Sequence, residues 1–490
     1  MRKRLVLFAL MLVVAVGALF GISAAVNEQK DRMEIEEEVL TGDLSEAEGL
    51  AIQAVSHMDY QLFWTTILHP GAAEVAETTF RFWPSRRSSA YEGSSYLEVR
   101  LGNANYGISG NVDLDDPEDR EGGWIWKPAA DVASRTPSGD QRTEIVALND
   151  YYDSFPMTFD YWLESEDGIM SYWVDSTEQD FEDLTAFFDV PIPDDVKMSV
   201  TVGKNADGTV VEINCNYAGD NVYDLWTSTV MTEEGGYFII PKMKNREEEQ
   251  IHYPILDSDR VNNDYGIYCF PVREKYEDQS GVLTPVMSEL HNGFPIEGDE
   301  NAVLLQHDAE TDQLLLLTEG QGHLWLTVID RPSMGELQRL DLGELGERES
   351  VFQMIHQGDL LMVTIEEEYD ADDEESEDAL SRRLVLLKRE ESTWSLELHA
   401  PLTWTTADGR RERMEVSETV QLAYEDGRLA IAQRDPYSWS CDVYVAVCQP
   451  EELRFAGAYR WKNTAGSDAR YDDMILPWTD GFAILRWSEK

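Results

Sequence analysis

Four aspartates between residues 113 and 119 form the densest group of metal-ligating residue types in the chain. Asp113, Asp115, Asp116 and Asp119 alternate with turn-forming residues and with Glu118. Carboxylate oxygens are the ligands that Ca²⁺ prefers in proteins. The spacing lacks the glycine at the sixth loop position and the distal glutamate of an EF-hand, so a solvated acidic loop is favoured and Ca²⁺ binding is the weaker alternative. The four aspartates are therefore candidate Ca²⁺ ligands, and the sequence suggests no other cofactor.

A second acidic run lies between Asp370 and Asp378. Like charges repel one another, so this run predicts a loop tip held open in water, with Ca²⁺ binding as the alternative. Trp124 and Trp126 flank Ile125, which is the pattern of a strand with one aromatic face. Exposed paired tryptophans that stack on sugar rings or bind a peptide are the alternative for this segment.

The sequence contains none of the common catalytic motifs. No two of the eight histidines have the four-residue spacing of a zinc-binding HExxH helix. There is no GxSxG nucleophile elbow, no P-loop and no GxGxxG after a strand. We therefore expect no catalytic residues, and a non-catalytic protein is favoured over an enzyme.

The four cysteines are too sparse for a disulfide scaffold. Cys441 and Cys448 bracket a strand-like run whose extended length of about 23 Å is far beyond disulfide reach. Cys215 and Cys269 either form a disulfide or remain two free thiols, and the sequence does not decide between these alternatives.

Charge narrows the classes of partner. The 490 residues include 39 Lys and Arg against 95 Asp and Glu, a net charge of −56. Such a surface repels nucleic acids and anionic lipid headgroups and favours cationic partners, divalent ions or solubility alone. Hydrophobic residues make up 42% of the chain, which is enough for a packed core. Nucleic-acid binding is excluded on these grounds.

The first 26 residues predict a membrane segment. Arg2, Lys3 and Arg4 precede the uncharged residues 5–26, a run long enough to span a bilayer and longer than a signal-peptide core. We expect an uncleaved anchor with the basic end in the cytoplasm. A secreted protein, cleaved near Ala25, is the alternative. Residues 27–48 then predict an acidic stalk outside the cytoplasm.

Short alternating apolar runs separated by turns fill the C-terminal half. Three successive sets of four strands are expected: residues 301–309, 313–320, 323–330 and 337–343; residues 351–357, 359–366, 383–389 and 393–402; residues 419–426, 428–435, 442–449 and 454–461. The first turns recur at about 50 residues once the acidic run is set aside, which is typical of β-propeller blades. One small sheet cannot bury both of its faces alone, so such units stack on their neighbours.

The last set, residues 472–487, has only two strands before the chain ends. Propellers complete such a blade with strands from the other terminus, which predicts that the region near Gly49 packs beside Trp487. Residues 143–215 fit the repeat less well. They predict a hairpin at 143–162, a helix over 176–188 and a possible α+β insert, preceded by a loop at 113–138.

The segments Gly42-Asp43, Ala47–Leu50 and Tyr60–Trp64 are similar to the start of the mature part in uncharacterised, single-anchor exported proteins of Gram-positive gut bacteria. The resemblance extends loosely over the chain. It implies topology and location, and no site residues.

The sequence therefore predicts an all-β protein, with an irregular six- to seven-bladed β-propeller-like domain over residues 49–490 after an N-terminal transmembrane helix. A pair of β-sandwiches is the alternative fold. The expected function is a non-catalytic extracytoplasmic binding or sensing module on the cell membrane, with a peptide, glycan or protein ligand. The alternatives are a surface polysaccharide hydrolase or lyase that uses scattered carboxylates, and a structural envelope protein.

Overall fold

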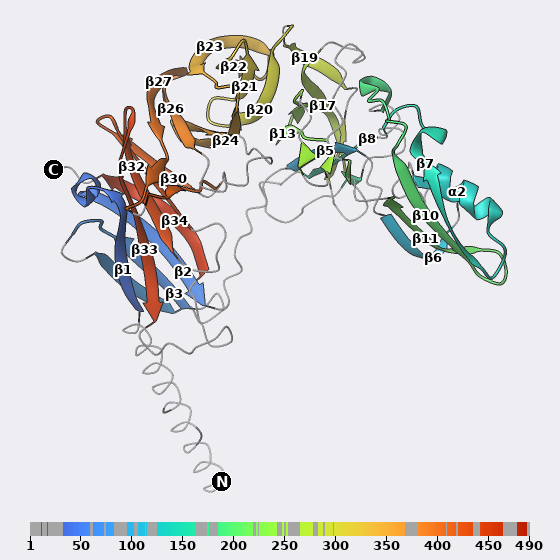
Figure 1. Ribbon diagram of the computed structural model, residues 1–490, viewed down its shortest axis with the longest axis horizontal. Coiled ribbons are helices and arrows are strands. Elements are labelled where there is room, and N and C mark those ends of the chain that lie inside the picture. The colour runs from blue at the N-terminus through green and yellow to red at the C-terminus, as the bar shows by residue number, and fades with distance from the viewer. Residues whose placement is uncertain are drawn as a thin grey trace. The chain divides into compact units, whose positions relative to one another are not determined.

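Antiparallel β-sheets make up most of the described chain in the computed structural model (Figure 1). The described residues are 33–58, 62–72, 75–82, 96–101, 106–112, 125–155, 157–162, 185–218, 225–242, 265–277, 283–287, 290–296, 298–367, 381–407, 409–417, 420–434, 442–463 and 478–487, with positions 11, 17, 114, 174–175, 222–223, 247–248 and 251–252. The chain divides into unit 1, residues 1–91 with 348–490, and unit 2, residues 92–347.

Three four-stranded meanders follow one another along the C-terminal half. They are β20–β23 (Asn301–Asp308, Gln313–Gly320, His323–Asp330, Gly335–Glu344), β24–β27 (Glu349–Gln357, Leu360–Glu367, Arg382–Glu390, Thr393–Pro401) and β30–β33 (Gln421–Glu425, Arg428–Arg434, Val443–Gln449, Glu452–Asn463). The predicted strands are confirmed, most within two residues, because each combines alternating apolar residues with a strong turn. A short hairpin, β28 (Thr403–Thr405) and β29 (Arg411–Arg413), lies between the second and third meanders.

The β30–β33 sheet buries both of its faces, which explains why its strands are almost continuously apolar. Leu429 and Ile431 pack with residues of the β24–β27 sheet. The alternate residues Ala430 and Ala432 point to the opposite face and pack with Leu50 and other residues near the N-terminus. Stacked sheets with interdigitating faces are therefore the packing principle of unit 1.

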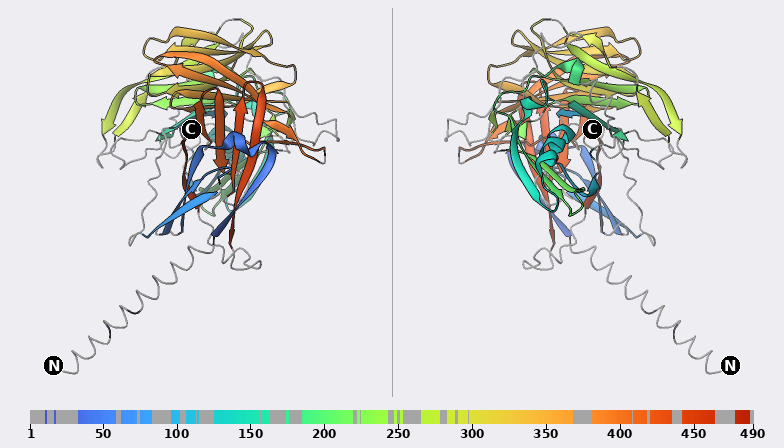
Figure 2. Two further views of the ribbon diagram at one scale, coloured as in Figure 1. Left: turned by 90° about the vertical axis from the view of Figure 1, so that its left-hand side faces the viewer. Right: turned by 90° about the vertical axis from the view of Figure 1, so that its right-hand side faces the viewer.

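The two ends of the chain meet in one sheet of unit 1. β34 (Trp478–Trp487) pairs with β2 (Leu50–Met58), and β3 (Leu62–Leu68) and β4 (Ala76–Phe82) complete the order β34-β2-β3-β4. The blue N-terminal strands lie among the red C-terminal ones in Figures 1 and 2. Leu50 is the register partner of Trp487, so the predicted contact between the Gly49 region and Trp487 is confirmed.

Part of the predicted acidic stalk is instead a strand. β1 (Met33–Gly42) pairs with β33 as a fifth, outermost strand of the β30–β33 sheet, and a 3-10 helix, η1 (Leu44–Ala47), follows it. Tyr459 donates its hydroxyl hydrogen to Glu37, 2.8 Å away, and Arg460 binds Glu38. An edge strand keeps one side in water, so it tolerates the glutamates that indicated a stalk.

Unit 2 contains two further blade-like sheets. One is formed by β5 (Tyr96–Leu101), β8 (Met157–Trp162) and β9 (Val174–Asp175). The other is formed by β13 (Ser228–Thr232), β14 (Gly235–Ile239), β17 (Gly266–Glu277), β18 (Leu283–Met287) and β19 (His291–Pro295). A small sheet joins β12 (Val222–Tyr223), β15 (Glu247–Glu248) and β16 (Ile251–His252). β13 packs against both β5 and β20, so these sheets share one core.

An α+β element lies within unit 2, but its helix is not the expected one. The sheet has the order β6-β11-β10-β7, from Tyr106–Val112, Val210–Tyr217, Lys197–Lys204 and Gln141–Ala147, and α2 (Trp126–Arg135) packs on β10 and β7. The loop predicted for residues 113–138 is therefore wrong where α2 lies, and Trp126 begins a helix rather than a strand. Of the helix predicted over 176–188, the described part is a single turn, Thr185–Phe188. The predicted 143–162 hairpin is also wrong, because β7 and β8 join different sheets and η4 (Leu148–Asp150) separates them.

The predicted membrane segment lies outside the described residues, apart from positions 11 and 17. Within the part of the chain that the structure describes, no helix has the length and hydropathy needed to span a bilayer.

Candidate functional site

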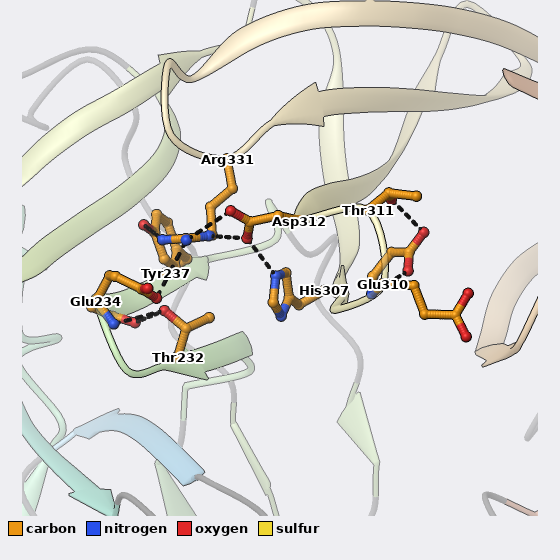
Figure 3. Close-up of polar contacts among 10 residues, drawn as sticks. Thr232, Glu234, Tyr237, His307, Glu310, Thr311, Asp312 and Arg331 are labelled. Carbon is orange, nitrogen blue, oxygen red and sulfur yellow. Dashed lines mark hydrogen bonds and ion pairs between the residues drawn. The ribbon is translucent and has the colours of Figure 1, made fainter. Parts of the chain in front are cut away.

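A cluster of charged and polar side chains surrounds Arg331 in unit 2 (Figure 3). Arg331 follows β22, Asp312 precedes β21, His307 lies on β20, and Glu234 and Tyr237 belong to the β13–β14 hairpin. The guanidinium donates to Asp312 through Nε and through Nη2, the latter at 2.9 Å. Nη1 lies 3.2 Å from the Tyr237 hydroxyl, and Nη2 lies 3.3 Å from a Glu234 carboxylate oxygen. One arginine thus connects two adjacent sheets.

Local strand pairing places Arg331 opposite Asp312. Gln313 and Asp330 are the last paired residues of the β21–β22 ladder, and the next residue on each strand continues the row. The Arg331 backbone N–H donates to the Asp312 carbonyl at 3.2 Å. Asp312 has a φ of 56°, a left-handed turn conformation that aspartate adopts more readily than most residues. The turn therefore presents its carboxylate to Arg331.

The charge states of the residues in this cluster favour a structural role, in which Arg331 joins the surrounding side chains. Arg331 is only 8% exposed. Its hydrogen bonds hold the pKa of the Asp312 carboxyl below the usual range, with a smaller contribution from His307 Nε2 at 3.1 Å. Burial raises the pKa of the Tyr237 phenol, which therefore stays protonated near neutral pH. The guanidinium faces two carboxylates and a phenol, so Arg331 holds these groups in fixed positions.

A cysteine and a histidine lie beside Tyr237 on the two neighbouring strands of its sheet. Tyr237 pairs with Cys269 across β14 and β17, and Cys269 pairs with His291 across β17 and β19. Cross-strand partners project to the same face of a sheet. The Cys269 Sγ lies 3.2 Å from His291 Nε2, and burial raises the pKa of the thiol to about 11. Cys269 is therefore a protonated thiol at neutral pH.

A second ionic cluster lies in unit 1 around Arg382, which is 1% exposed. Its guanidinium binds Glu366, lies 3.1 Å from Glu415 and donates to the Met414 carbonyl at 2.7 Å. Arg413 also reaches Glu415, at 2.9 Å. Two strands of the β24–β27 sheet and the segment after β29 are joined by this cluster.

The predicted calcium ligands Asp113, Asp115, Asp116 and Asp119 lie outside the described residues, as do Trp124 and the acidic run at 370–378. In the described ranges, no three His, Cys, Asp or Glu side chains converge as a metal site. Cys215, Cys269 and Cys448 are free thiols, so the Cys215–Cys269 disulfide does not form. The Arg331 cluster was not predicted. Its sequence signal is a pair of opposite charges, Asp312 and Arg331, at the open end of one predicted hairpin.

Replacing Asp312 with asparagine is expected to lower the free energy of unfolding at pH 7 by about 1 kcal/mol, because a half-exposed ion pair is partly screened. A carboxyl whose pKa is lower in the folded state stabilises the protein above its unfolded pKa of about 4 and loses that effect as pH falls further. Urea unfolding at pH 7 and pH 3 measures this. The difference in the free energy of unfolding between wild type and Asp312→Asn should be smaller at pH 3 than at pH 7. Glu336 is exposed, so the control variant Glu336→Gln should match wild type at both pH values. A gap of the same size at both pH values would contradict the role given to Asp312.

Comparisons with known proteins do not identify a family. No protein-family model and no curated protein sequence matches the chain. Among solved structures, it is similar to a putative 6-phosphogluconolactonase from Bacteroides uniformis, with 9% identity, a TM-score of 0.24 and coverage of 84% of this chain and 99% of that one. It is also similar to TolB from Acinetobacter baumannii, with 9% identity, a TM-score of 0.15 and coverage of 74% and 96%. TM-scores this low do not show that the proteins share a fold or a function.

Proposed function

We propose that the protein is a non-catalytic binding or sensing module, held on the outer side of the cytoplasmic membrane by residues 1–26. Its body is β-propeller-like: unit 1 contains the blade-like sheets β34-β2-β3-β4, β24–β27 and β30–β33, and unit 2 contains the blade-like sheets β5-β8-β9, β13-β14-β17-β18 and β20–β23. The α+β element is interleaved in sequence with the β5-β8-β9 sheet, because β6, α2 and β7 lie between β5 and β8, whereas β10 and β11 follow β9.

The observation that carries this proposal is the stacking of small meanders in unit 1. The β30–β33 sheet is covered on both faces by neighbouring sheets, and one of these is assembled from both ends of the chain. Closely packed sheets position the loops that connect their strands, and loops on a packed scaffold are used for recognition. The geometry therefore favours binding.

Charge supports a cationic ligand. Many of the described arginines lie in ion pairs with the protein's own carboxylates: Arg135 with Asp131, Arg339 with Glu300, Arg383 with Glu349, Arg454 with Glu452 and Arg460 with Glu38. These arginines are thus neutralised by carboxylates of the same chain, and the chain as a whole has a net charge of −56. A basic peptide or protein segment, or a cationic glycan, complements this surface, and nucleic acid does not.

Four described carboxyl groups are held in the ionised form, which is not the state that the acid of a glycosidase needs. A glycosidase needs a carboxylic acid whose pKa is raised so that it can protonate the leaving group. The pKa values of the Asp43, Asp312, Asp341 and Glu367 carboxyls are all lowered. Each is stabilised as a carboxylate, mainly by hydrogen bonds.

Two measurements test the proposal. In the first, a protease added to intact cells should degrade the body of the protein. Without protease, the protein should stay in the membrane fraction after a carbonate wash, and its N-terminal residues should still be present. The purified full-length protein, in detergent, should then bind saturably to an array of basic peptides and amino-sugar glycans and release no reducing ends from them. New reducing ends would replace the proposal with the hydrolase alternative, and protection from the protease in intact cells would refute the topology.

A further inference from the structure

The strand β7 forms one edge of the α+β sheet in unit 2. Among the described residues it pairs with β10 alone, in a register without shifts. Proteins usually protect an exposed edge with bulges, prolines or lysines, because an open edge can pair with another strand. The other edge of this sheet, β6, has a register shift against β11, and the edge strands β20 and β23 also pair with register shifts. By contrast, β7 contains no proline, no lysine and no shift.

Hydrogen bonds at the two ends of β7 show which of its backbone groups point outward. The Lys204 N–H donates to the Asp140 carbonyl at 2.9 Å, and the Leu148 N–H donates to the Val196 carbonyl at 3.1 Å. Along an antiparallel pair, residues that bond to the partner strand alternate with residues whose N–H and C=O point the other way. The even-numbered residues therefore bond to β10, and the odd-numbered residues of β7 direct their backbone groups away from it.

The odd-numbered side chains of β7 include three uncharged ones, Gln141, Thr143 and Ile145. They are exposed, Ile145 to 67%, on the face opposite to the one that packs against α2. Their neighbours on β10 are also uncharged, since Thr143 pairs with Thr201 and Ile145 pairs with Ser199. In a chain with a net charge of −56, this face offers little electrostatic repulsion to a second copy of the chain.

The even-numbered side chains of β7 carry two opposite charges. Arg142 and Glu144 bind each other within one copy, and Arg135 of α2 lies 2.6 Å from the same carboxylate. If two copies of β7 pair antiparallel about Thr143, Arg142 of each copy lies opposite Glu144 of the other. A two-fold axis one residue away would place Arg142 opposite Arg142, or Glu144 opposite Glu144, and such like-charge pairs are destabilising. The charges therefore select the register centred on Thr143.

We propose that β7 is a self-association edge, at which two copies of this chain pair about a two-fold axis at Thr143. Both copies use the same surface, as a two-fold interface requires, and two four-stranded sheets become one continuous sheet. The backbone groups of Thr143 bond to Thr143 of the other copy, and those of Gln141 bond to Ile145 of the other copy. This pairing is independent of the ligand proposed above.

Disulfide trapping in the purified full-length protein tests both the pairing and its register. A ladder of this length is weak, and mild oxidation captures it. Thr143→Cys should cross-link to a dimer, because its two Cα atoms would lie about 5.5 Å apart. Gln141→Cys and Ile145→Cys, oxidised separately, should not cross-link, because each lies about 14 Å from its own copy. An equimolar mixture of these two variants should cross-link.

Two controls set the background of this experiment. Thr201→Cys lies one strand further from the edge and should stay monomeric. Wild type should also stay monomeric, because its described cysteines are buried. A Thr143→Cys protein that forms no more dimer than these controls would overturn the proposal. Self-cross-linking of Gln141→Cys or Ile145→Cys as fast as that of Thr143→Cys would overturn the register.

Charge substitutions in the Thr143→Cys protein give a second measurement, the initial rate of cross-linking. Arg142→Glu and Glu144→Arg should each lower this rate about tenfold, because each places like charges opposite one another at two symmetric positions. An equimolar mixture of the two variants should recover the rate as a heterodimer. The double variant should recover it as well, because its charges are again self-complementary. Rates that are unchanged in both single variants, or not recovered in the mixture, would overturn the pairing.

Discussion

Replacing Arg382 with methionine is expected to lower the free energy of unfolding of unit 1 by about 3–5 kcal/mol. The guanidinium is 1% exposed and binds both Glu366 and Glu415. Methionine fills most of the volume but leaves two poorly solvated carboxylates without their main positive partner. Removing one member of a buried ionic cluster costs far more than removing a surface pair. Urea unfolding followed by tryptophan fluorescence measures the loss.

The neighbouring arginine supplies a matched control. Arg383 lies on the same strand, points to the other face and makes a two-hydrogen-bond pair with Glu349 at 2.9 and 2.8 Å. Its guanidinium is partly exposed, so Arg383→Met should cost about 1 kcal/mol or less. The triple variant Arg382→Met, Glu366→Gln, Glu415→Gln should recover part of the loss, because it removes the uncompensated charges. Equal destabilisation by the two single arginine substitutions would show that burial of the cluster does not matter.

Truncating Trp487 to alanine is expected to destabilise unit 1 by about 3–5 kcal/mol. Trp487 is 4% exposed in the core that contains Leu50 and Phe455, and the Arg428 guanidinium lies 4.2 Å from its ring centroid. It is the last described residue of the chain, where substitutions are ordinarily harmless. Here the terminal strand completes a sheet, so the indole is a core residue.

Trp226→Ala is the control for this prediction, because the same side chain is 40% exposed there and its loss should cost about 1 kcal/mol or less. A shift in the urea midpoint of the same size for both tryptophan variants would contradict the closure of the sheet by β34. Deletion of residues 478–490 should have a larger effect than either, since it also leaves the backbone of β2 unpaired along one edge.

The repetitive part of the fold follows from local rules. Each predicted strand of the C-terminal half has alternating side chains and ends at a turn, and several turns contain a residue with positive φ, such as Asp312, Gly358 and Gly427. Information of this kind lies within ten residues. It predicts which segments are strands, and hairpin pairing follows from it.

Segments whose structure depends on distant partners were predicted poorly. β1 is rich in glutamate, and its partner β33 is near the other end of the chain, so nothing local distinguishes it from a stalk. The helix α2 begins without a capping side chain and has no acidic residue in its first turn, so two of the usual start signals are absent. Its burial of Trp126, Ala129 and Val132 against the sheet stabilises it.

The two ionic clusters have the same origin. Arg331 meets Tyr237 and Glu234 only after two hairpins have packed together, and Arg382 meets Glu415 across a separate segment. Acidic residues are so frequent in this chain that no spacing singles out the ones that matter. The acidic residues that matter are those that the fold places beside a buried arginine.

Assembly order during synthesis follows from the pairing of β2 with β34. Unit 2 is continuous in sequence and can complete its sheets once residue 347 has been made. The first strands of unit 1 leave the ribosome much earlier, yet β34, the hydrogen-bonding partner of β2, is made only after unit 2 and most of unit 1. At typical rates of about 5–20 residues per second, these strands wait for tens of seconds with an open edge.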